Sequence, residues 1–477
     1  MNKGSRFLPD RALLPTGPRT VCVLGLIAMG LWGCQNTPPV CSESNSALVG
    51  EMAVEIHDTM GSIVIATWEQ SCEGESWLEY SFDADEWLQS PSKHRGVGAA
   101  EELALGVPFG SEVSLRLAWE GDSQESWSET VSIQTKVLPW APANPEVLVA
   151  DSGGWDSETR WVLLSLIEEE EDSVLEGEQG RPPGMWNLVM DRKGRTVWAM
   201  RVPLGRVSFH PRLSYDESAF LLDRNSFWSI YDNGRASQVL EVTIDGSVEK
   251  TYDTPGLHQP FLQISDGSLL WAATSEGWMD RLVKLSVDGE ESTVWSCRAL
   301  HEHLDVENYC AANTLSWNEE ADTFLLSFYS TDSVVEIDHA SGAATRWFGH
   351  LPQAWSFQPP ESAFWWQHGV HYTPEGTLLL STSDVEDAQE TVVREYSLDD
   401  STETLVEIWN FGLGDGILAD EMGEVRRLGN GNIFHNYGTT PRLREASPEG
   451  QVVWDVSWEA QRLGNTVPLS DLYRFMP

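Results

Sequence analysis

Three histidines stand at matching places in the second part of this 477-residue chain, each ahead of an apolar, strand-like segment. His258 and His368 share the phrase His-x(7 or 8)-Gly-x-Leu-Leu, and His210 precedes a segment that ends in Phe-Leu-Leu at position 222. Neutral imidazole is a good nucleophile near neutral pH. Equivalent placement in successive structural units would point all three rings toward one site. The alternative is that each ring is an ordinary hydrogen-bonded residue at the start of a strand.

A repeated phrase predicts the elements that would position these histidines. In each copy a short strand, an acidic or glycine turn and a second strand end on an aromatic residue. Six copies occur, ending at Trp198, Tyr252, Trp295, Trp347, Trp409 and Trp454. The spacing leaves room for about four short strands in each unit. One such sheet cannot bury both of its faces, so the units must stack around an axis. The repeats predict an all-β six-bladed propeller over residues 151–477.

Residues 50–138 show a different pattern, with short alternating strands separated by turn residues. Strands are expected at residues 62–69, 76–83, 111–120 and 128–135. This spacing is typical of a seven-stranded, immunoglobulin-like β-sandwich. The segments Leu103–Gly110 and Val131–Thr135 resemble the strand-turn-strand and the closing strand of fibronectin type III domains. A proline-rich linker is expected at residues 139–150, between the sandwich and the propeller.

The N-terminus has the features of a bacterial export signal. Basic residues precede an apolar core, Val21–Leu31, which is too short to span a bilayer. The core runs into Leu31-Trp32-Gly33-Cys34, which resembles a lipobox whose cysteine is acylated. We therefore expect a signal peptide at residues 1–33, a lipid anchor on Cys34 and a tether at 34–49. A plain signal peptide and a single-pass anchor are the alternatives.

The expected address is the cell envelope. Gln35 stands after the lipobox cysteine where an aspartate often marks retention in the inner membrane. This favours an outer-membrane lipoprotein that faces the periplasm or the cell surface.

Cysteine usage agrees with export. Besides Cys22 and Cys34, four cysteines remain, and an even number suits disulfides in an oxidising compartment. Three connectivities exist, and the local pairs Cys41–Cys72 and Cys297–Cys310 are the most economical because each lies within one expected domain. No metal site is expected, because no Cys-x-x-Cys occurs and the acidic run at 168–172 lacks the ligand spacing of a calcium loop.

The chain is strongly acidic, with 74 Asp and Glu residues against 30 Lys and Arg and a formal charge of −44 at pH 7. Such a surface repels nucleic acid and anionic lipid headgroups. A nucleic-acid partner is therefore excluded, and no cofactor is expected.

Three longer phrases, at residues 313–349, 367–382 and 425–456, resemble the bacterial arylsulfate sulfotransferases. The likeness covers roughly residues 50 to 470. Members of that family join an N-terminal β-sandwich to a six-bladed propeller and work in the periplasm. They move a sulfuryl group from one phenol to another by way of a sulfated histidine. The resemblance implies an arylsulfotransferase-like protein whose ligands are small phenols or aryl sulfates.

The resemblance also implies site residues. The Gln-His-Asp phrase of the family's nucleophile matches Gln367-His368-Gly369, and a neighbouring histidine matches His258. The asparagine of the family's His-x-Asn-Ser matches Asn313. We expect His368, His258 and Asn313 to carry the chemistry, and His210, Tyr329, Thr439 and Thr440 to contact the substrate.

Two positions depart from the family in a way that matters for charge. Ala311 stands where the family has a histidine, and the family's arginine falls on Tyr329 or its neighbour Phe328. Sulfuryl oxygens and a departing phenolate need cationic or hydrogen-bonding partners. One alternative is an active transferase in which Arg426, Arg427, Arg442 or Arg444 supplies the charge. The other is a catalytically degenerate propeller that binds a ligand or a partner at the cell envelope.

Overall fold

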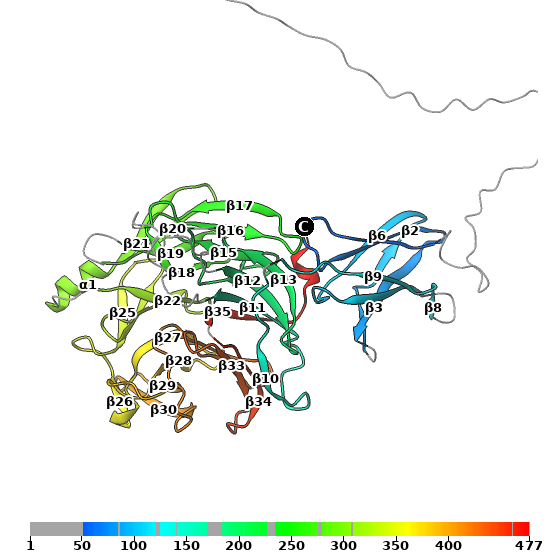
Figure 1. Cartoon of the computed structure of the whole chain (residues 1–477). Coiled ribbons are helices and arrows are strands. Elements are labelled where there is room, and N and C mark those ends of the chain that lie inside the picture. The colour runs from blue at the N-terminus through cyan, green and yellow to red at the C-terminus, as the bar shows by residue number, and fades with distance from the viewer. Residues whose placement is uncertain are drawn as a thin grey trace, which may run out of the picture. The chain divides into compact units, whose positions relative to one another are not determined.

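The computed structural model describes residues 51–476, except 84–85, 121–124, 140, 169–183, 204, 227–233, 275–278, 307–308 and 460. The predicted signal peptide and tether, with Cys34 and Cys41, lie outside these residues, as does most of the acidic run at 168–172. The described chain is almost entirely β, as expected (Figure 1). Its helices are α1 (Cys297–Leu304) and two short 3-10 turns, η1 (Pro360–Ser362) and η2 (Tyr473–Phe475). Within the described ranges, no helix is long and apolar enough to cross a membrane.

Residues 53–134 form two antiparallel sheets that share one hydrophobic core. The smaller sheet contains β1 (Ala53–Ile56), β2 (Val64–Gln70) and β6 (Gly98–Ala104). The larger sheet contains β3 (Gly74–Asp83), β4 (Glu86–Gln89), β5 (Lys93–Arg95), β7 (Glu112–Glu120), β8 (Glu125–Trp127) and β9 (Val131–Gln134). Alternate side chains of β2 and β7, such as Val64 and Leu115, point into the core. These are nine strands rather than the seven expected, because short strands pair along the long β3 and β7.

Six further sheets, named I to VI here, contain the remaining strands of the described residues. Sheet I contains β35 (Gln461–Leu469), β11 (Trp161–Glu168), β12 (Met185–Asp191) and β13 (Thr196–Arg201). Sheet II contains β14 (Arg212–Leu213), β15 (Phe220–Arg224), β16 (Gln238–Val242) and β17 (Val248–Asp253). Sheet III contains β18 (Leu257–Gln263), β19 (Leu269–Ala273), β20 (Arg281–Leu285) and β21 (Glu291–Ser296).

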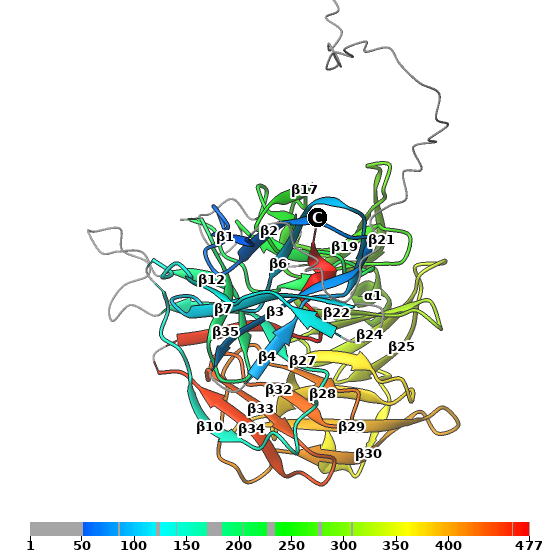
Figure 2. The ribbon, with the colours of Figure 1, turned by 90° about the vertical axis from the view of Figure 1, so that its right-hand side faces the viewer.

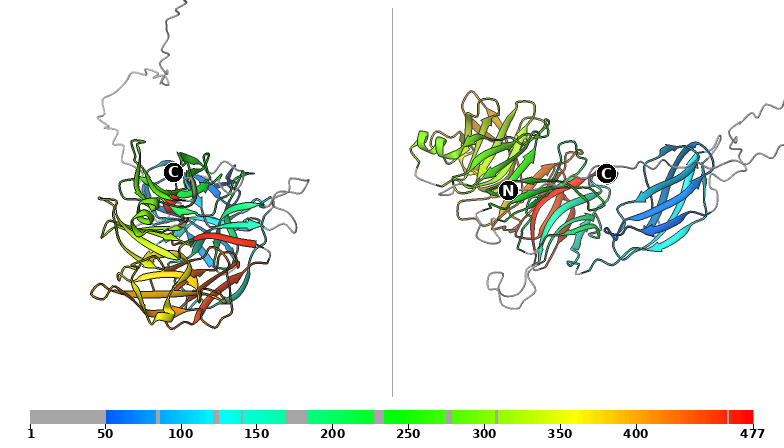
Figure 3. Two further views of the ribbon diagram at one scale, coloured as in Figure 1. Left: turned by 90° about the vertical axis from the view of Figure 1, so that its left-hand side faces the viewer. Right: turned by 90° about the horizontal axis from the view of Figure 1, so that it is seen from above.

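Sheets IV to VI continue the same order along the chain. Sheet IV contains β22 (Ala312–Asn318), β23 (Thr323–Phe328), β24 (Ser333–Asp338) and β25 (Ala344–Gly349). Sheet V contains β27 (Trp365–Tyr372), β28 (Leu378–Ser383), β29 (Thr391–Asp399), β30 (Thr404–Phe411) and the parallel edge strand β26 (Ser356–Gln358). Sheet VI contains β31 (Glu424–Arg427), β32 (Ile433–Asn436), β33 (Arg442–Ala446), β34 (Val452–Ser457) and β10 (Glu146–Ala150). The arrangement is that of a propeller-like fold (Figure 3).

The repeated aromatic residues fall one to a sheet. They lie on β13, β17, β21, β25, β30 and β34, the fourth strand of the antiparallel path in each case. Several of them tie neighbouring sheets together. The indole nitrogen of Trp198 donates to the carbonyl of Ile244, in the β16–β17 turn of sheet II, at 2.8 Å. Trp454 of sheet VI donates in the same way to Arg192, in the β12–β13 turn of sheet I, at 2.9 Å. The repeat therefore marks the places where one sheet packs on the next.

The expected linker at residues 139–150 is wrong in its second half. Residues 146–150 form β10, which pairs antiparallel with β34 as the fifth strand of sheet VI (Figure 2). The free edge of β34 offers unpaired backbone groups, and an extended segment that passes beside it can satisfy them. The proline-rich composition of the neighbouring residues hid this short strand.

Hydrogen bonds join each sheet to the next and the last sheet to the first. Their partners, in order from the I–II junction to the VI–I junction, are Asn465 N to Phe209 O (2.6 Å), Asn225 Nδ2 to His258 O (2.8 Å), Ala312 N to Asp280 Oδ2 (2.6 Å), Asn313 Nδ2 to Gln367 O (2.8 Å), Ser381 Oγ with His435 Nε2 (2.9 Å), and Asn436 Nδ2 to Gly464 O (2.7 Å). Most of these groups are buried, where a polar group without a partner is costly.

Candidate functional site

The predicted histidines lie where the first strands of successive sheets begin. These strands, β35, β14, β18, β22, β27 and β31, are called the leading strands here, and β18, β22, β27 and β31 contact one another in turn. His210 comes just before β14, His258 is the second residue of β18, and His368 lies in the first half of β27. Asn313 is the second residue of β22. The four residues therefore come from four successive sheets.

His258 is fully buried and faces a carboxylate. Its Nε2 lies 3.6 Å from Oδ2 of Asp280. The same carboxylate accepts hydrogen bonds from the Thr274 hydroxyl and from the Ala312 backbone N–H, both at 2.6 Å. Asp280 is thus held by two donors, and it gives the His258 ring an anionic neighbour.

His210 is buried beside a second carboxylate. Asp223 accepts the backbone N–H groups of His210, at 2.9 Å, and of Phe209, at 3.1 Å. Burial lowers the pKa of His210 well below its ordinary value, and the positive charge of Arg212 acts in the same direction.

His368 has a defined tautomer. Its Nδ1 lies 2.9 Å from the carbonyl oxygen of Trp366, which can only accept a hydrogen bond. Nδ1 therefore carries the proton, and Nε2 carries the lone pair. Burial lowers the pKa of His368 to about 4, against a smaller opposing effect of the Trp366 carbonyl. The ring is thus neutral at neutral pH, as a nucleophile must be.

The cavity beside His368 is small. It measures about 10 Å³ and is lined by Trp366, His368, Ser381, Thr382, Ser383, Thr391, Ala419, Asp420 and Met422. That volume holds about one water molecule. No arginine or lysine of the described chain lines the cavity, whereas Asp420 brings a negative charge to it.

Asn313 acts on the segment that carries His368. Its side-chain NH₂ donates to the carbonyl of Gln367 at 2.8 Å, and the hydroxyl of Thr314 accepts the N–H of Gly369 at 2.9 Å. The residues on both sides of His368 are thereby anchored to sheet IV. Asn313 is therefore placed to position His368.

Gly369 explains one departure from the sulfotransferase phrase. Its φ is +64°, in the left-handed region that disfavours other residues. A Cβ at this position would lie 2.8 Å from the Cα of Glu424. The aspartate that the family carries here has no room in this fold.

The two altered positions lie side by side. The N–H of Ala311 donates to the hydroxyl of Ser330, next to Tyr329, at 3.0 Å. Burial, together with the smaller effects of Tyr309, Asp280 and Glu421, raises the pKa of Tyr329 to about 12, so its phenol remains a neutral donor. These positions therefore carry no positive charge.

Thr439 and Thr440 brace a loop. Their hydroxyls donate to the carbonyls of Glu421 and Leu418, respectively. This loop carries Asp420 and Met422, which line the cavity at His368. Both threonines therefore shape a wall of that cavity.

The arginines that could replace the missing cations are paired with carboxylates. Arg426 lies 2.8 Å from Glu424, and Arg427 contacts Glu395. Arg442 and Arg444 both contact Asp455, at 2.6 and 3.1 Å, and Arg444 also contacts Asp415.

Sequence reasoning missed a charged group at the start of sheet VI. Glu424 lies 3.2 Å from Arg212 and 2.8 Å from Arg426, and it accepts the N–H of Thr466 at 2.9 Å. Burial opposes ionisation of Glu424, but the two arginines lower the pKa of its carboxyl.

Burial lowers the pKa of His371 to about 4, and Arg426 and Arg212 add to the effect. The phrase His-Gly-Val-His contains His371 as its second histidine, and this was the signal in the sequence that could have pointed to His371.

A larger cavity lies at the far ends of the leading strands. It has a volume of about 480 Å³ and is lined by residues of β14, β18, β31 and β35, among them Arg212, Gln263, Arg426 and Leu469. Arg427 and Arg474 also line it, together with Asp156, Glu158, Glu217 and Asp471. Its wall therefore alternates positive and negative groups.

The structure joins Cys297 and Cys310 by a disulfide, with their Cα atoms 6.5 Å apart. Cys72 lies in the described chain, but Cys41 does not, so the pairing of these two remains a prediction.

Comparisons with known proteins show no family. No protein-family model matches the chain, and no curated protein matches it. Among solved structures, it is similar to a proposed 6-phosphogluconolactonase from Bacteroides uniformis, with 11% identity, a TM-score of 0.40, and coverage of 83% of this chain and 99% of the other. A streptogramin B lyase has 12% identity and a TM-score of 0.36, with coverage of 66% and 88%. Similarities this weak carry no argument about activity.

Proposed function

We propose that residues 146–469 are a closed six-bladed propeller and that residues 53–134 are a fibronectin type III-like sandwich. Three observations support the propeller. One copy of the aromatic phrase falls on each of sheets I to VI. Hydrogen bonds link the six sheets in a circuit. The C-terminal strand β35 pairs with β11 of the first sheet, which would close the ring. The leading strands are then the inner strands around a central channel.

We propose that the protein is an arylsulfate sulfotransferase-like enzyme in which His368 accepts the sulfuryl group. The observation that supports this most is the hydrogen bond from Nδ1 of His368 to Trp366, which leaves the lone pair on Nε2. Nε2 would attack the sulfur of an aryl sulfate, and the bond from sulfur to the phenol oxygen would break. The phenolate leaves and takes a proton from water. A second phenol then attacks the sulfur, the N–S bond breaks, and the phenol's proton passes to solvent.

The proposed transfer is slow. By the family resemblance Tyr329 would stand in place of a cation, and Asp420 lies at the cavity beside His368. Loss of one charged donor at such a site costs on the order of 10² to 10³ in rate. We expect turnover of a simple aryl sulfate such as nitrophenyl sulfate to be at least that much below an arginine-bearing enzyme.

The test is release of nitrophenol from nitrophenyl sulfate with a phenol acceptor present. The wild type should show weak turnover, and His368→Ala should abolish it. The double change Ala311→His with Tyr329→Arg should increase it, because it restores positive charge beside the sulfuryl group. His350→Ala is the control, since His350 is an exposed histidine outside the cavity lining whose ring stacks on Trp365. Turnover that survives His368→Ala would disprove the histidine mechanism.

A second candidate function is ligand binding without catalysis, and the 480 Å³ cavity favours it. That volume lies within the range of small-molecule sites. Arg426→Gln would remove a cation from its wall, while Arg212 would still pair with Glu424. Calorimetry with nitrophenyl sulfate distinguishes the two functions. Binding lost in Arg426→Gln and retained in His368→Ala supports a binding module, and the reverse supports the transferase.

We propose that the mature chain is an outer-membrane lipoprotein anchored through Cys34. The support is the lipobox-like sequence that ends at Cys34. Cys34→Ser should block processing or release the protein from the membrane fraction. A variant that remains in that fraction at the normal mature mass would disprove the anchor.

A further inference from the structure

Four side chains that carry sulfur or nitrogen atoms converge beside α1, the helix that directly follows β21 of sheet III. Cys297 and His301 are four residues apart on this helix, so they share one of its faces. Cys310 is joined to Cys297, and the ligand atoms of Cys297, His301 and Cys310 all lie within 4.8 Å of one another. The Sγ of Cys310 lies 3.7 Å from the thioether sulfur of Met279.

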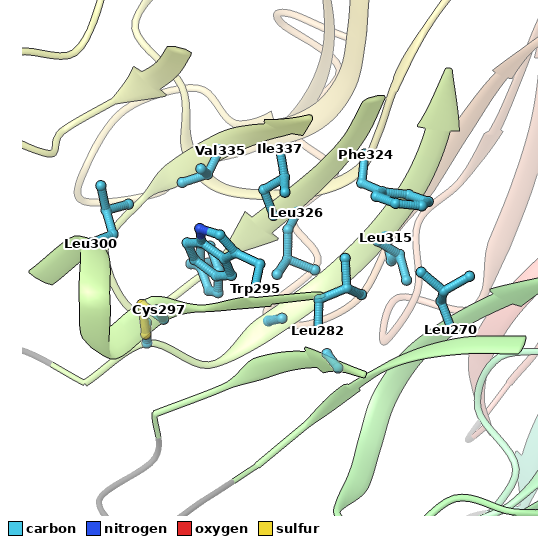
Figure 4. Packing of buried hydrophobic residues seen from close by; sticks show 14 of the residues in the cluster. Leu270, Leu282, Trp295, Cys297, Leu300, Leu315, Phe324, Leu326, Val335 and Ile337 are labelled. Atoms are coloured by element: carbon cyan, nitrogen blue, oxygen red, sulfur yellow. A yellow bond between two sulfur atoms is a disulfide. The ribbon is translucent and has the colours of Figure 1, made fainter. Parts of the chain in front are cut away.

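Three members of this cluster are buried, Met279 is partly buried, and backbone contacts hold the cluster together. The exposed fractions of Cys297, His301 and Cys310 are 1%, 2% and 0%. Met279 and Cys310 form a parallel β-bridge, which keeps their side chains together. Trp295, Leu300 and Phe328 belong to the surrounding hydrophobic core. Figure 4 shows Cys297 near Trp295 and Leu300. Water therefore competes little for the cluster.

We propose that Cys297, His301, Cys310 and Met279 form a binding site for Cu(I) when the disulfide is reduced. Thiolate, thioether and imidazole groups are the soft and borderline ligands that Cu(I) prefers, and a thioether argues against Zn(II). Metal–sulfur bonds of about 2.3 Å in a tetrahedral site place two sulfur ligands about 3.8 Å apart. The sulfur atoms of Cys310 and Met279 already have this separation. The cluster would therefore have two states, an oxidised state with the disulfide and a reduced state that binds Cu(I).

The change between the two states balances with a dithiol reductant. Two electrons and two protons from the dithiol break the bond between the sulfurs of Cys297 and Cys310, and the dithiol becomes a disulfide. Both cysteine thiols then lose their protons to solvent as Cu(I) binds. In the oxidised state neither sulfur has the charge that a metal needs, so the disulfide form should not bind.

The test measures Cu(I) binding by the full mature chain, before and after reduction with a dithiol. A chromogenic Cu(I) chelator competes for the metal, and circular dichroism checks that the reduced protein is folded. The reduced wild type should bind one Cu(I) that is absent from the Cys297→Ser, Cys310→Ser double variant. Met279→Leu and His301→Gln should each weaken this binding at least tenfold. Both keep the disulfide, so their folding is verified before reduction.

His303→Gln is the matched control, because His303 lies on the same helix but is exposed. It should leave Cu(I) affinity unchanged. Equal Cu(I) binding by the reduced wild type and the double cysteine variant would overturn the proposal. So would affinity that is unaffected by both Met279→Leu and His301→Gln, or tighter binding of Zn(II) than of Cu(I).

Discussion

The Asp280 carboxylate lies 3.6 Å from Nε2 of His258, while the backbone of Asp280 is hydrogen bonded to both cysteines of the disulfide. Its N–H donates to the carbonyl of Cys310 at 3.1 Å, and its carbonyl accepts from Cys297 at 3.0 Å. One residue therefore connects the disulfide cluster to a histidine of the candidate site. Reduction of the disulfide would therefore affect His258 through the side chain of Asp280.

Asp280→Ala should lower the free energy of unfolding by about 3 kcal/mol. The substitution leaves the buried N–H of Ala312 and the hydroxyl of Thr274 without their acceptor, and each such loss costs roughly 1–3 kcal/mol. Urea unfolding at pH 7 measures the change. Asp266→Ala is the control, because Asp266 is half exposed and pairs with Lys284 at the surface. It should cost less than about 1 kcal/mol. Equal losses in the two variants would contradict the assigned role of Asp280.

Asn313→Asp should destabilise the protein and displace His368. A carboxylate at this position cannot donate to Gln367, and it would place a negative charge against that carbonyl in a buried setting. We expect a cost of about 3 kcal/mol, measured by urea unfolding. Asn318→Asp on the same strand is the control, since Asn318 accepts the N–H of Ala321 and aspartate can do the same. A tolerated Asn313→Asp would show that this link between sheets IV and V is dispensable.

Stability should fall as the pH decreases from about 6.5 toward 3, and His435 should be one cause. Burial lowers the pKa of His435 to about 3, from an ordinary value of 6.5. Between these values the unfolded chain binds a proton that the folded chain does not. The free energy of unfolding is therefore fully retained above about pH 6.5 and decreases as the pH falls toward 3. Each unit of difference corresponds to about 1.4 kcal/mol.

His435→Gln should therefore flatten the dependence of the unfolding free energy on pH in this range. Glutamine keeps a hydrogen-bonding group near the hydroxyl of Ser381, which lies 2.9 Å from Nε2 of His435. Unfolding midpoints in urea at pH 8, where the side chain at 435 is neutral in both proteins, correct for any packing difference. Parallel curves for wild type and variant from pH 7 to 4 would contradict the prediction.

Gly464→Ala should disrupt the junction between sheets I and II. A Cβ at this position would lie 2.4 Å from the carbonyl oxygen of Phe209 and 2.9 Å from Cβ of Ser165, both in closely packed structure. Overpacking of this kind costs about 1–3 kcal/mol, which thermal unfolding can detect. The matched control is Gly429→Ala, because no atom lies within 4 Å of a Cβ there. If the two variants melt together, the junction is looser than the structure shows.

Much of the architecture could be predicted from the sequence, because it depends on local patterns. The phrase that ends at Trp198, Trp295 or Trp454 combines two strands and a turn, so it marks part of one sheet wherever it occurs. The shared phrase after His258 and His368 likewise placed both histidines ahead of apolar strands. β10 escaped prediction because its stability comes from the edge of β34, which lies about 300 residues later in the chain.

The sequence by itself determined the class of fold, the strand phrases and the histidines at the beginnings of strands, since these follow from side-chain alternation and turn chemistry. Only the tertiary structure decided which charges meet. It pairs Arg426 with Glu424, so a cation that the sequence offered is already neutralised. It also brings Met279 into contact with Cys310, and no Cys-x-x-Cys motif in the sequence predicts this contact. Electrostatic and metal-binding properties depend on distances of a few ångströms between residues far apart in the chain, and such distances exist only after folding.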